Sequence, residues 1–82
     1  MFAGVFALVD PTARTLVRKL TPRQLEVLEL ITREMGTREI AQHLKVSVKT
    51  VEPHRAAIMT RTNTRSTVGL ALLAVRAGMV AL

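Results

Sequence analysis

The hydrophobic positions of the chain recur at the three- and four-residue spacing of helices and do not alternate as they do in strands. Residues 22–35 carry an apolar stripe that consists of Leu25, Leu28, Ile31 and Met35. Thr21 and Pro22 stand before this stripe, and Gly36 stands after it. A capping threonine followed by proline starts a helix, and glycine ends one. We therefore expect a helix from Pro22 that continues to Met35 and stops at Gly36.

Two shorter helical patterns follow, separated by a tight connection. Residues 37–44 read "TREIAQHL", and Thr37 is expected to cap them. After the three residues 45–47, Ser47 is expected to cap a second helix that runs from Val48 to about Arg61. One face of this second helix collects Val51, His54, Ile58 and the stem of Arg61. Two short helices joined by a short turn form a helix-turn-helix, whose second helix can enter a DNA major groove about 12 Å wide.

The two ends of the chain carry weaker signals. Asp10 followed by Pro11 is a helix start, so residues up to about Lys19 form either a short helix or a linker. The apolar opening "MFAGVFALVD" has no basic residues before it and is too short to span a bilayer, so we read it as a disordered leader or as a strip that a partner surface covers. Near the other end, Ser66 is expected to cap a helix that ends at Ala77 before Gly78.

The last predicted helix has more apolar residues than one face can hold. Its first stripe is Leu70, Ala74 and Ala77. Its second stripe is Val68, Leu72, Val75 and Met79. A helix that is apolar on two sides needs two partners, so the second stripe is a candidate homodimer interface. The alternative is that residues 2–9 cover it within one chain.

The composition supports one small all-α domain. The chain has 82 residues, 49% of them hydrophobic, and Phe2 and Phe6 are its only aromatic residues. Such a composition favours helices over sheet. We predict a small four-helix bundle that contains the helix-turn-helix, with or without a short extra N-terminal helix. The absence of cysteine excludes disulfides and thiolate sites and fits a reducing cytoplasm.

Charge points to nucleic acid, and nothing points to catalysis. Twelve Lys and Arg against six Asp and Glu give a net charge of +6, which attracts polyanions. The four glycines are isolated, so there is no phosphate-cradling loop, and neither histidine has a nucleophile or ligand set beside it. We expect no enzyme activity, cofactor or metal.

Two runs carry a family resemblance, "LTPRQLEVLELI" and "TREIAQHLKVSVKTVEPHRAAIMTR". They resemble the DNA-binding domain of the LuxR/FixJ (GerE or NarL) transcription regulators, which reads approximately L-T-P-R-E-x-E-V-L, then I-A-x-x-L-x-x-S-x-x-T-V-x-x-H-x-x-x-I-x-x-K-L. The resemblance covers Leu20 to about Val80. The matching residues are Leu20, Thr21, Pro22, Arg23, Glu26, Val27, Leu28, Ile40, Ala41, Leu44, Ser47, Thr50, Val51, His54 and Ile58.

The resemblance implies a sequence-specific double-stranded DNA-binding domain in residues 20–82 that regulates transcription. Residues 1–19 would be a leader or linker, partly helical. The implied DNA contacts are Thr50 for a phosphate, Lys49, Glu52, Pro53 and Ala56 facing the groove, Arg55 and Arg61 as further backbone contacts, and Thr37 and Arg38 at the start of the preceding helix. His54 lies on the face of Val51 and Ile58, so a packing or capping role is expected and not base reading, and His43 is expected to lie on the surface. The resemblance also implies that the stripe of Leu70, Ala74 and Ala77 faces inward.

The chain departs from the family pattern at Gln24, where the family usually has Glu, and at Thr62, where it has a buried Leu. Loss of a buried Leu side chain costs about 2 to 5 kcal/mol when the site cannot collapse. We therefore expect marginal stability or a loosened last turn before Ser66.

Pro53 stands inside the expected recognition helix. With Ser47 as the cap, it is the sixth helical residue and forfeits the hydrogen bond to the Lys49 carbonyl, at a cost of about 3 kcal/mol. Either the helix persists with a bend from Lys49 to Pro53, or it begins nearer Thr50. We expect the bent, continuous helix, because the apolar positions on both sides still fit one face.

Two alternatives remain for the function: a sigma-factor-like promoter-binding domain, and a protein-interaction module that keeps the fold but has lost DNA binding. Asp10 is the only aspartate, so the acidic pocket of a receiver domain is missing and we expect an output domain only. The implied partners are double-stranded DNA, a second copy of the chain and RNA polymerase, with no membrane, in a bacterial cytoplasm at the nucleoid.

Overall fold

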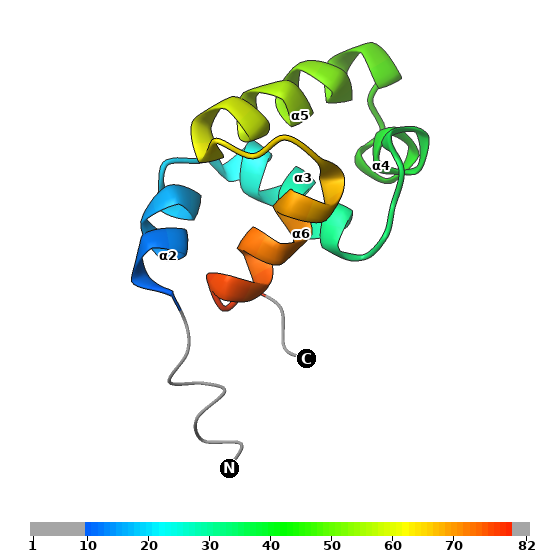
Figure 1. The fold of residues 1–82 in the computed structure, drawn as a ribbon. Helices are drawn as coiled ribbons and strands as arrows, with labels where there is room; N and C mark the ends of the chain where they lie inside the picture. The colour runs from blue at the N-terminus through cyan, green and yellow to red at the C-terminus, as the bar shows by residue number, and fades with distance from the viewer. Residues whose placement is uncertain (1–9, 80–82) are drawn as a thin grey trace.

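The computed structural model describes residues 10–79, which contain five helices and no strand. The helices are α2 (Pro11–Arg18), α3 (Pro22–Thr32), α4 (Thr37–Leu44), α5 (Val48–Thr62) and α6 (Thr67–Arg76). The all-α prediction is confirmed, and α2 is the extra N-terminal helix. In Figure 1, α5 lies along one side of the molecule with α4 beside its first turn, while α3 and α6 lie beneath it and α2 lies at the far end.

Side-chain caps begin four of these helices as the sequence predicted. Asp10 accepts from the Thr12 amide at 2.9 Å and begins α2. At the start of α3, the Gln24 amide donates to Thr21 Oγ1 (3.2 Å) and the Thr21 amide donates to Gln24 Oε1 (3.0 Å). This pair is a complete capping box. Gln24 therefore performs the capping that the family's usual Glu can perform, and its departure from the pattern costs no hydrogen bond.

Two predicted boundaries around the α3–α4 connection are wrong. Helix α3 ends at Thr32 and not at Met35, because Glu34 takes a left-handed conformation (φ 65°) that a helix cannot continue. Helix α4 is capped by Gly36 and not by Thr37, which is its first helical residue. The Glu39 side chain accepts from the Gly36 amide at 3.2 Å, so half of a capping box forms without any side chain at the cap.

The core is built by aliphatic side chains from all five helices. Helix α3 is central and packs against both α5 and α6, with Leu28 fully buried. Ile40 of α4, Ile58 of α5 and Leu70 of α6 are also fully buried. Each such side chain contributes about 1.5–3 kcal/mol relative to its exposed state. The short helix α4 depends on this packing, since eight residues do not form a stable helix alone.

Helix α2 is attached to the rest of the domain and is not a free linker. Ala13 and Val17 are buried in the same core. The Asp10 amide donates to the Arg76 carbonyl at 2.8 Å, and Arg61 Nη1 donates to the Lys19 carbonyl at 3.1 Å. Of the two alternatives left by the sequence for this stretch, the structure has the helix.

The expected loosened turn at Thr62 is wrong. Helix α5 includes Thr62, and its side chain is buried. The Thr62 hydroxyl lies 2.6 Å from the Ile58 carbonyl and 3.1 Å from Thr64 Oγ1. The small polar side chain therefore bonds to its own helix and leaves no unpaired hydroxyl. The expected marginal stability stays a prediction.

Candidate nucleic-acid interface

The turn between α4 and α5 fixes how the second helix is presented. Lys45 ends α4 in a left-handed conformation (φ 59°), and the Val46 amide donates to the Ala41 carbonyl at 3.0 Å. Two residues later, Ser47 caps α5 as predicted, accepting from the Thr50 amide at 3.2 Å. Ser47 Oγ also lies 3.0 Å from Thr50 Oγ1. The predicted helix-turn-helix is thus present, with a three-residue connection.

Helix α5 separates its buried and exposed sides sharply. Val51 and Ile58 are fully buried against the rest of the domain. The side turned to solvent carries the four predicted groove-facing residues, which are Lys49, Glu52, Pro53 and Ala56. Their spacing of three and four residues places them on one stripe of the helix. Nothing from residues 10–79 covers this stripe, so it is available to an external surface.

Pro53 does not break α5. The helix runs from Val48 to Thr62 with Pro53 inside it, so the prediction of a continuous helix is confirmed and the later start near Thr50 is wrong. Pro53 and Lys49 are both exposed. The Lys49 carbonyl, to which Pro53 cannot donate, therefore belongs to the exposed side of the helix, where a missing partner costs less than in a core. The bend itself stays a prediction.

The start of α4 lies beside this exposed helix. Arg38 is exposed and Thr37 is half-buried. Because Gly36 has no side chain, the first amides of α4 have no side-chain cap. Such amides, together with the positive end of the helix dipole, attract anions.

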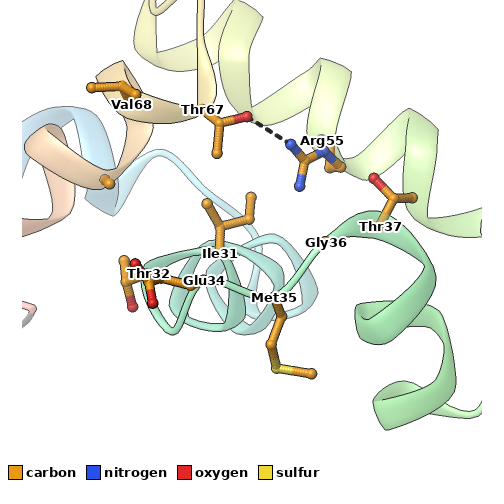
Figure 2. Close-up of a pocket in the computed structure, with 10 residues that line it drawn as sticks. Ile31, Thr32, Glu34, Met35, Gly36, Thr37, Arg55, Thr67 and Val68 are labelled. Carbon is orange, nitrogen blue, oxygen red and sulfur yellow. Dashed lines mark hydrogen bonds between the residues drawn. The ribbon is translucent and has the colours of Figure 1, made fainter.

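The two predicted arginine contacts of α5 make bonds within the domain. Arg55 Nη2 donates to Thr67 Oγ1 at 3.0 Å, as Figure 2 shows, which ties α5 to the first turn of α6. Arg61 donates to the Lys19 carbonyl. Sequence reasoning missed Thr67, because a contact between side chains twelve positions apart on different helices leaves no periodic signal.

The two histidines lie as expected. His54 is half-buried on α5, and His43 is exposed on α4. Within residues 10–79, no three His, Asp or Glu residues are arranged to hold a metal ion. No described helix combines the length and hydropathy that crossing a membrane requires.

The predicted dimer stripe, which runs along α6 and on to Met79 beyond the end of this helix, is only partly open. Val68 is 69% exposed and Leu72 is 52% exposed. Val75 and Met79 are half-buried, and Met79 packs against the core. The inward stripe is confirmed at Leu70 and Ala74, which are fully buried, while Ala77 is half-buried and packs against the core. The alternative cover, residues 2–9, lies outside the described residues.

Comparison with known proteins adds an independent result. A family model described as "GerE: Bacterial regulatory proteins, luxR family" matches residues 18–74. The match includes the capping box of α3, the whole helix-turn-helix and most of α6.

Individual relatives agree with this match. The oxygen regulatory protein NreC of Staphylococcus epidermidis is 51% identical over 47 residues, which are 57% of this chain and 22% of the relative. NreC of Staphylococcus carnosus (strain TM300) is 51% identical over 49 residues, which are 60% of this chain and 23% of the relative. The crystal structure of full-length FixJ from B. japonicum superposes with a TM-score of 0.76 and 33% identity, covering 96% of this chain and 38% of that chain. The chain therefore spans between about a fifth and two fifths of these proteins.

Proposed function

We propose, because the chain belongs to the luxR family of bacterial regulatory proteins, that it binds double-stranded DNA sequence-specifically and regulates transcription as the output domain of a response regulator. A bacterial nucleoid location and contact with RNA polymerase are parts of the same proposal. We propose that the DNA-binding domain of residues 20–82 also includes α2, because this helix shares the core.

The observation that carries the proposal is the exposed stripe of α5. A continuous helix of fifteen residues is anchored on one side by fully buried aliphatic residues and is free on the other. A major groove accepts one α-helix, and readout requires that the inserted helix hold its side chains rigidly. The stripe meets both requirements.

The four residues of the stripe would all contact bases. Lys49 can donate to guanine, and Glu52 can accept from a cytosine amine. Pro53 and Ala56 present apolar surface suited to a thymine methyl group. Because only two of these four residues carry hydrogen-bonding groups, we expect part of the specificity to come from DNA shape.

Backbone contacts would come from the edges of the motif. Thr50 and Arg38 are exposed beside the stripe, and Thr37 lies at the uncapped start of α4. Arg61 stays a predicted phosphate contact, although its guanidinium already holds the Lys19 carbonyl. A guanidinium has five N–H donors and this bond uses one of them, so four remain and both roles are compatible.

Footprinting on genomic fragments, followed by titration of the selected duplex, tests the proposal. We expect Lys49→Ala to weaken the selected duplex by about 1–3 kcal/mol and to relax preference at one base pair. Arg76→Ala is the matched control, since it removes the same charge from the exposed end of α6, away from α5. Equal losses in both variants would reduce the effect to net charge and refute base reading by Lys49.

We further propose a homodimer through the second stripe of α6, supported by the exposure of Val68 and Leu72. Val75 and Met79 would contribute their half-buried edges. Such a dimer binds a two-fold site with half-sites about 34 Å apart. Sedimentation of wild type and of Leu72→Glu tests it: a wild-type protein that stays monomeric at high concentration and on DNA contradicts this part of the proposal alone.

A second candidate is a protein-interaction module that has lost DNA binding. The internal bonds of Arg55 and Arg61 favour it, because each uses one donor of a predicted phosphate contact within the domain itself. Binding to random duplex as a function of salt separates the two functions, since a phosphate reader loses affinity steeply as salt rises. Absence of duplex binding at low salt would favour the interaction module.

A further inference from the structure

Arg55 has a donor that the domain does not satisfy. Among the described residues, its Nη1 is the buried side-chain atom that lacks a hydrogen-bond partner, whereas its Nη2 donates to Thr67 Oγ1. A buried charged donor without an acceptor is unfavourable. The ion pairs of residues 10–79 are Arg23 with Glu26 and Arg33 with Glu29, so no carboxylate of this region pairs with Arg55. Arg55 therefore has a donor left over for an additional acceptor.

Arg55 lines a pocket of about 610 Å³, drawn in Figure 2, which lies between the end of α3, the start of α4, α5 and the start of α6. Its apolar wall is formed by Ile31, Met35, Val68 and Ala71. Its polar lining includes Thr37 and Thr67, each the first residue of a helix. The volume is larger than a single ion fills.

The polar groups around Arg55 are mostly donors. Thr67 Oγ1 accepts from Arg55, which leaves the hydroxyl hydrogen of Thr67 free to donate. Thr37 adds a second hydroxyl, and the amides of the first turn of α4 have no side-chain cap. Donors that converge beside an arginine suit an acceptor-only, negatively charged group.

We propose that this pocket is a seat for one phosphate-type oxyanion, held by Arg55, Thr67 and Thr37. The oxyanion is a backbone phosphate when a duplex is bound, an assignment that rests on the proposed function, or free phosphate in its absence. The seat makes Thr67 a phosphate-binding residue and explains why the Arg55 side chain turns toward α6 and away from the groove-facing stripe.

Glu34 opposes the anion and therefore gives a sharp test. It lines the same pocket, and its backbone is held at φ 65° after α3. If the seat exists, Glu34→Gln removes a repulsive charge and strengthens phosphate binding several-fold. If Glu34 were the true partner of Arg55 in solution, the same change would destabilise the fold and leave phosphate binding absent, which would overturn the proposal.

The free-ion arm uses inorganic phosphate and two-dimensional NMR of the full chain, with sodium chloride at equal ionic strength as the reference titration. We expect saturable shifts of the Thr37 and Thr67 amides and of the Arg55 side chain. Arg55→Gln and Thr67→Val should each weaken this binding at least tenfold while the remaining spectrum keeps its folded dispersion. Arg65→Gln, which removes an exposed arginine outside the pocket, should leave it unchanged.

The duplex arm measures the salt dependence of binding for the same variants. Loss of one phosphate contact in Arg55→Gln should lower the slope of log K against log salt by about 0.9, without altering sequence preference. An unchanged slope with local phosphate shifts assigns the seat to free phosphate alone. An unchanged slope without such shifts overturns the seat while wild-type duplex binding still supports the proposed function. Local shifts in a protein that binds no duplex keep the seat and reject the function.

Discussion

Replacement of Pro53 by alanine should stabilise the domain, because α5 runs through the proline without the hydrogen bond that alanine would restore. A proline inside a helix costs about 3 kcal/mol through the missing donor and the clash with the carbonyl one turn back. Proline also restricts the unfolded chain, and losing that restriction returns about 0.4–1 kcal/mol. The net expected gain is about 2 kcal/mol.

Thermal and urea unfolding followed by circular dichroism measures this gain. For a domain of this length, about 2 kcal/mol corresponds to a rise in Tm of roughly 10 °C. Pro22→Ala is the matched control, because Pro22 is the first residue of α3, where no helical bond is lost. That variant should gain nothing or lose up to about 1 kcal/mol.

The two prolines therefore have opposite expected signs. If Pro53→Ala left the free energy of unfolding unchanged while Pro22→Ala behaved as expected, the Lys49 carbonyl would already be fully satisfied by solvent. The reasoning that the recognition helix carries a stability cost at Pro53 would then be refuted.

Three further substitutions test local features by the same unfolding measurement. Ser47→Ala should lower the free energy of unfolding by about 1 kcal/mol through loss of the α5 cap, and a silent change would mean that the Thr50 amide is satisfied otherwise. Thr62→Val should cost about 1 kcal/mol, because the buried hydroxyl bond to the Ile58 carbonyl disappears, and a gain would show that the apolar contact outweighs that bond. Lys45→Gly should stabilise by about 0.5–1 kcal/mol, since left-handed backbone costs a non-glycine residue about 1–2 kcal/mol and glycine loses part of this advantage as chain entropy; a loss would contradict strain at the turn.

Helix starts were predictable because their causes are local. A capping oxygen bonds an amide two or three residues ahead, so the short run of sequence contains the whole interaction. This holds for Asp10, Thr21, Ser47 and Ser66. The buried side of α5 was predictable for a related reason, since the period of Val51 and Ile58 is the period of the helix.

The errors arose where one local signal competed with another. Thr37 is a good cap by type, but Gly36 takes that position because the Glu39 side chain reaches back to the Gly36 amide. The apolar pattern extends to Met35, yet the backbone turns at Glu34, and Met35 still packs against the core from outside the helix. Periodicity indicates which residues are buried and says less about where the helical hydrogen bonds stop.

The sequence could not predict the hydrogen bonds that join different helices at the site. The type of Arg55 suggests a phosphate contact, but its bond to Thr67 depends on how α5 crosses α6. The bond from Arg61 to Lys19 spans 42 positions and ends on a backbone carbonyl, which has no residue-specific signal at all. These contacts decide which cations are free to meet a duplex, so the assignment of backbone contacts is the least predictable part of the interface.

The hydrogen bond from the Asp10 amide to the Arg76 carbonyl holds the start of α2 beside the end of α6. Asp10, the first described residue, therefore lies next to the end of α6, and Figure 1 places the start of α2 and the end of α6 on the side of the molecule remote from α5. Domains with adjoining ends tolerate circular permutation and insertion into other proteins. A second protein fused at these adjacent ends would lie on the side of the domain opposite α5. It would therefore not block the recognition helix.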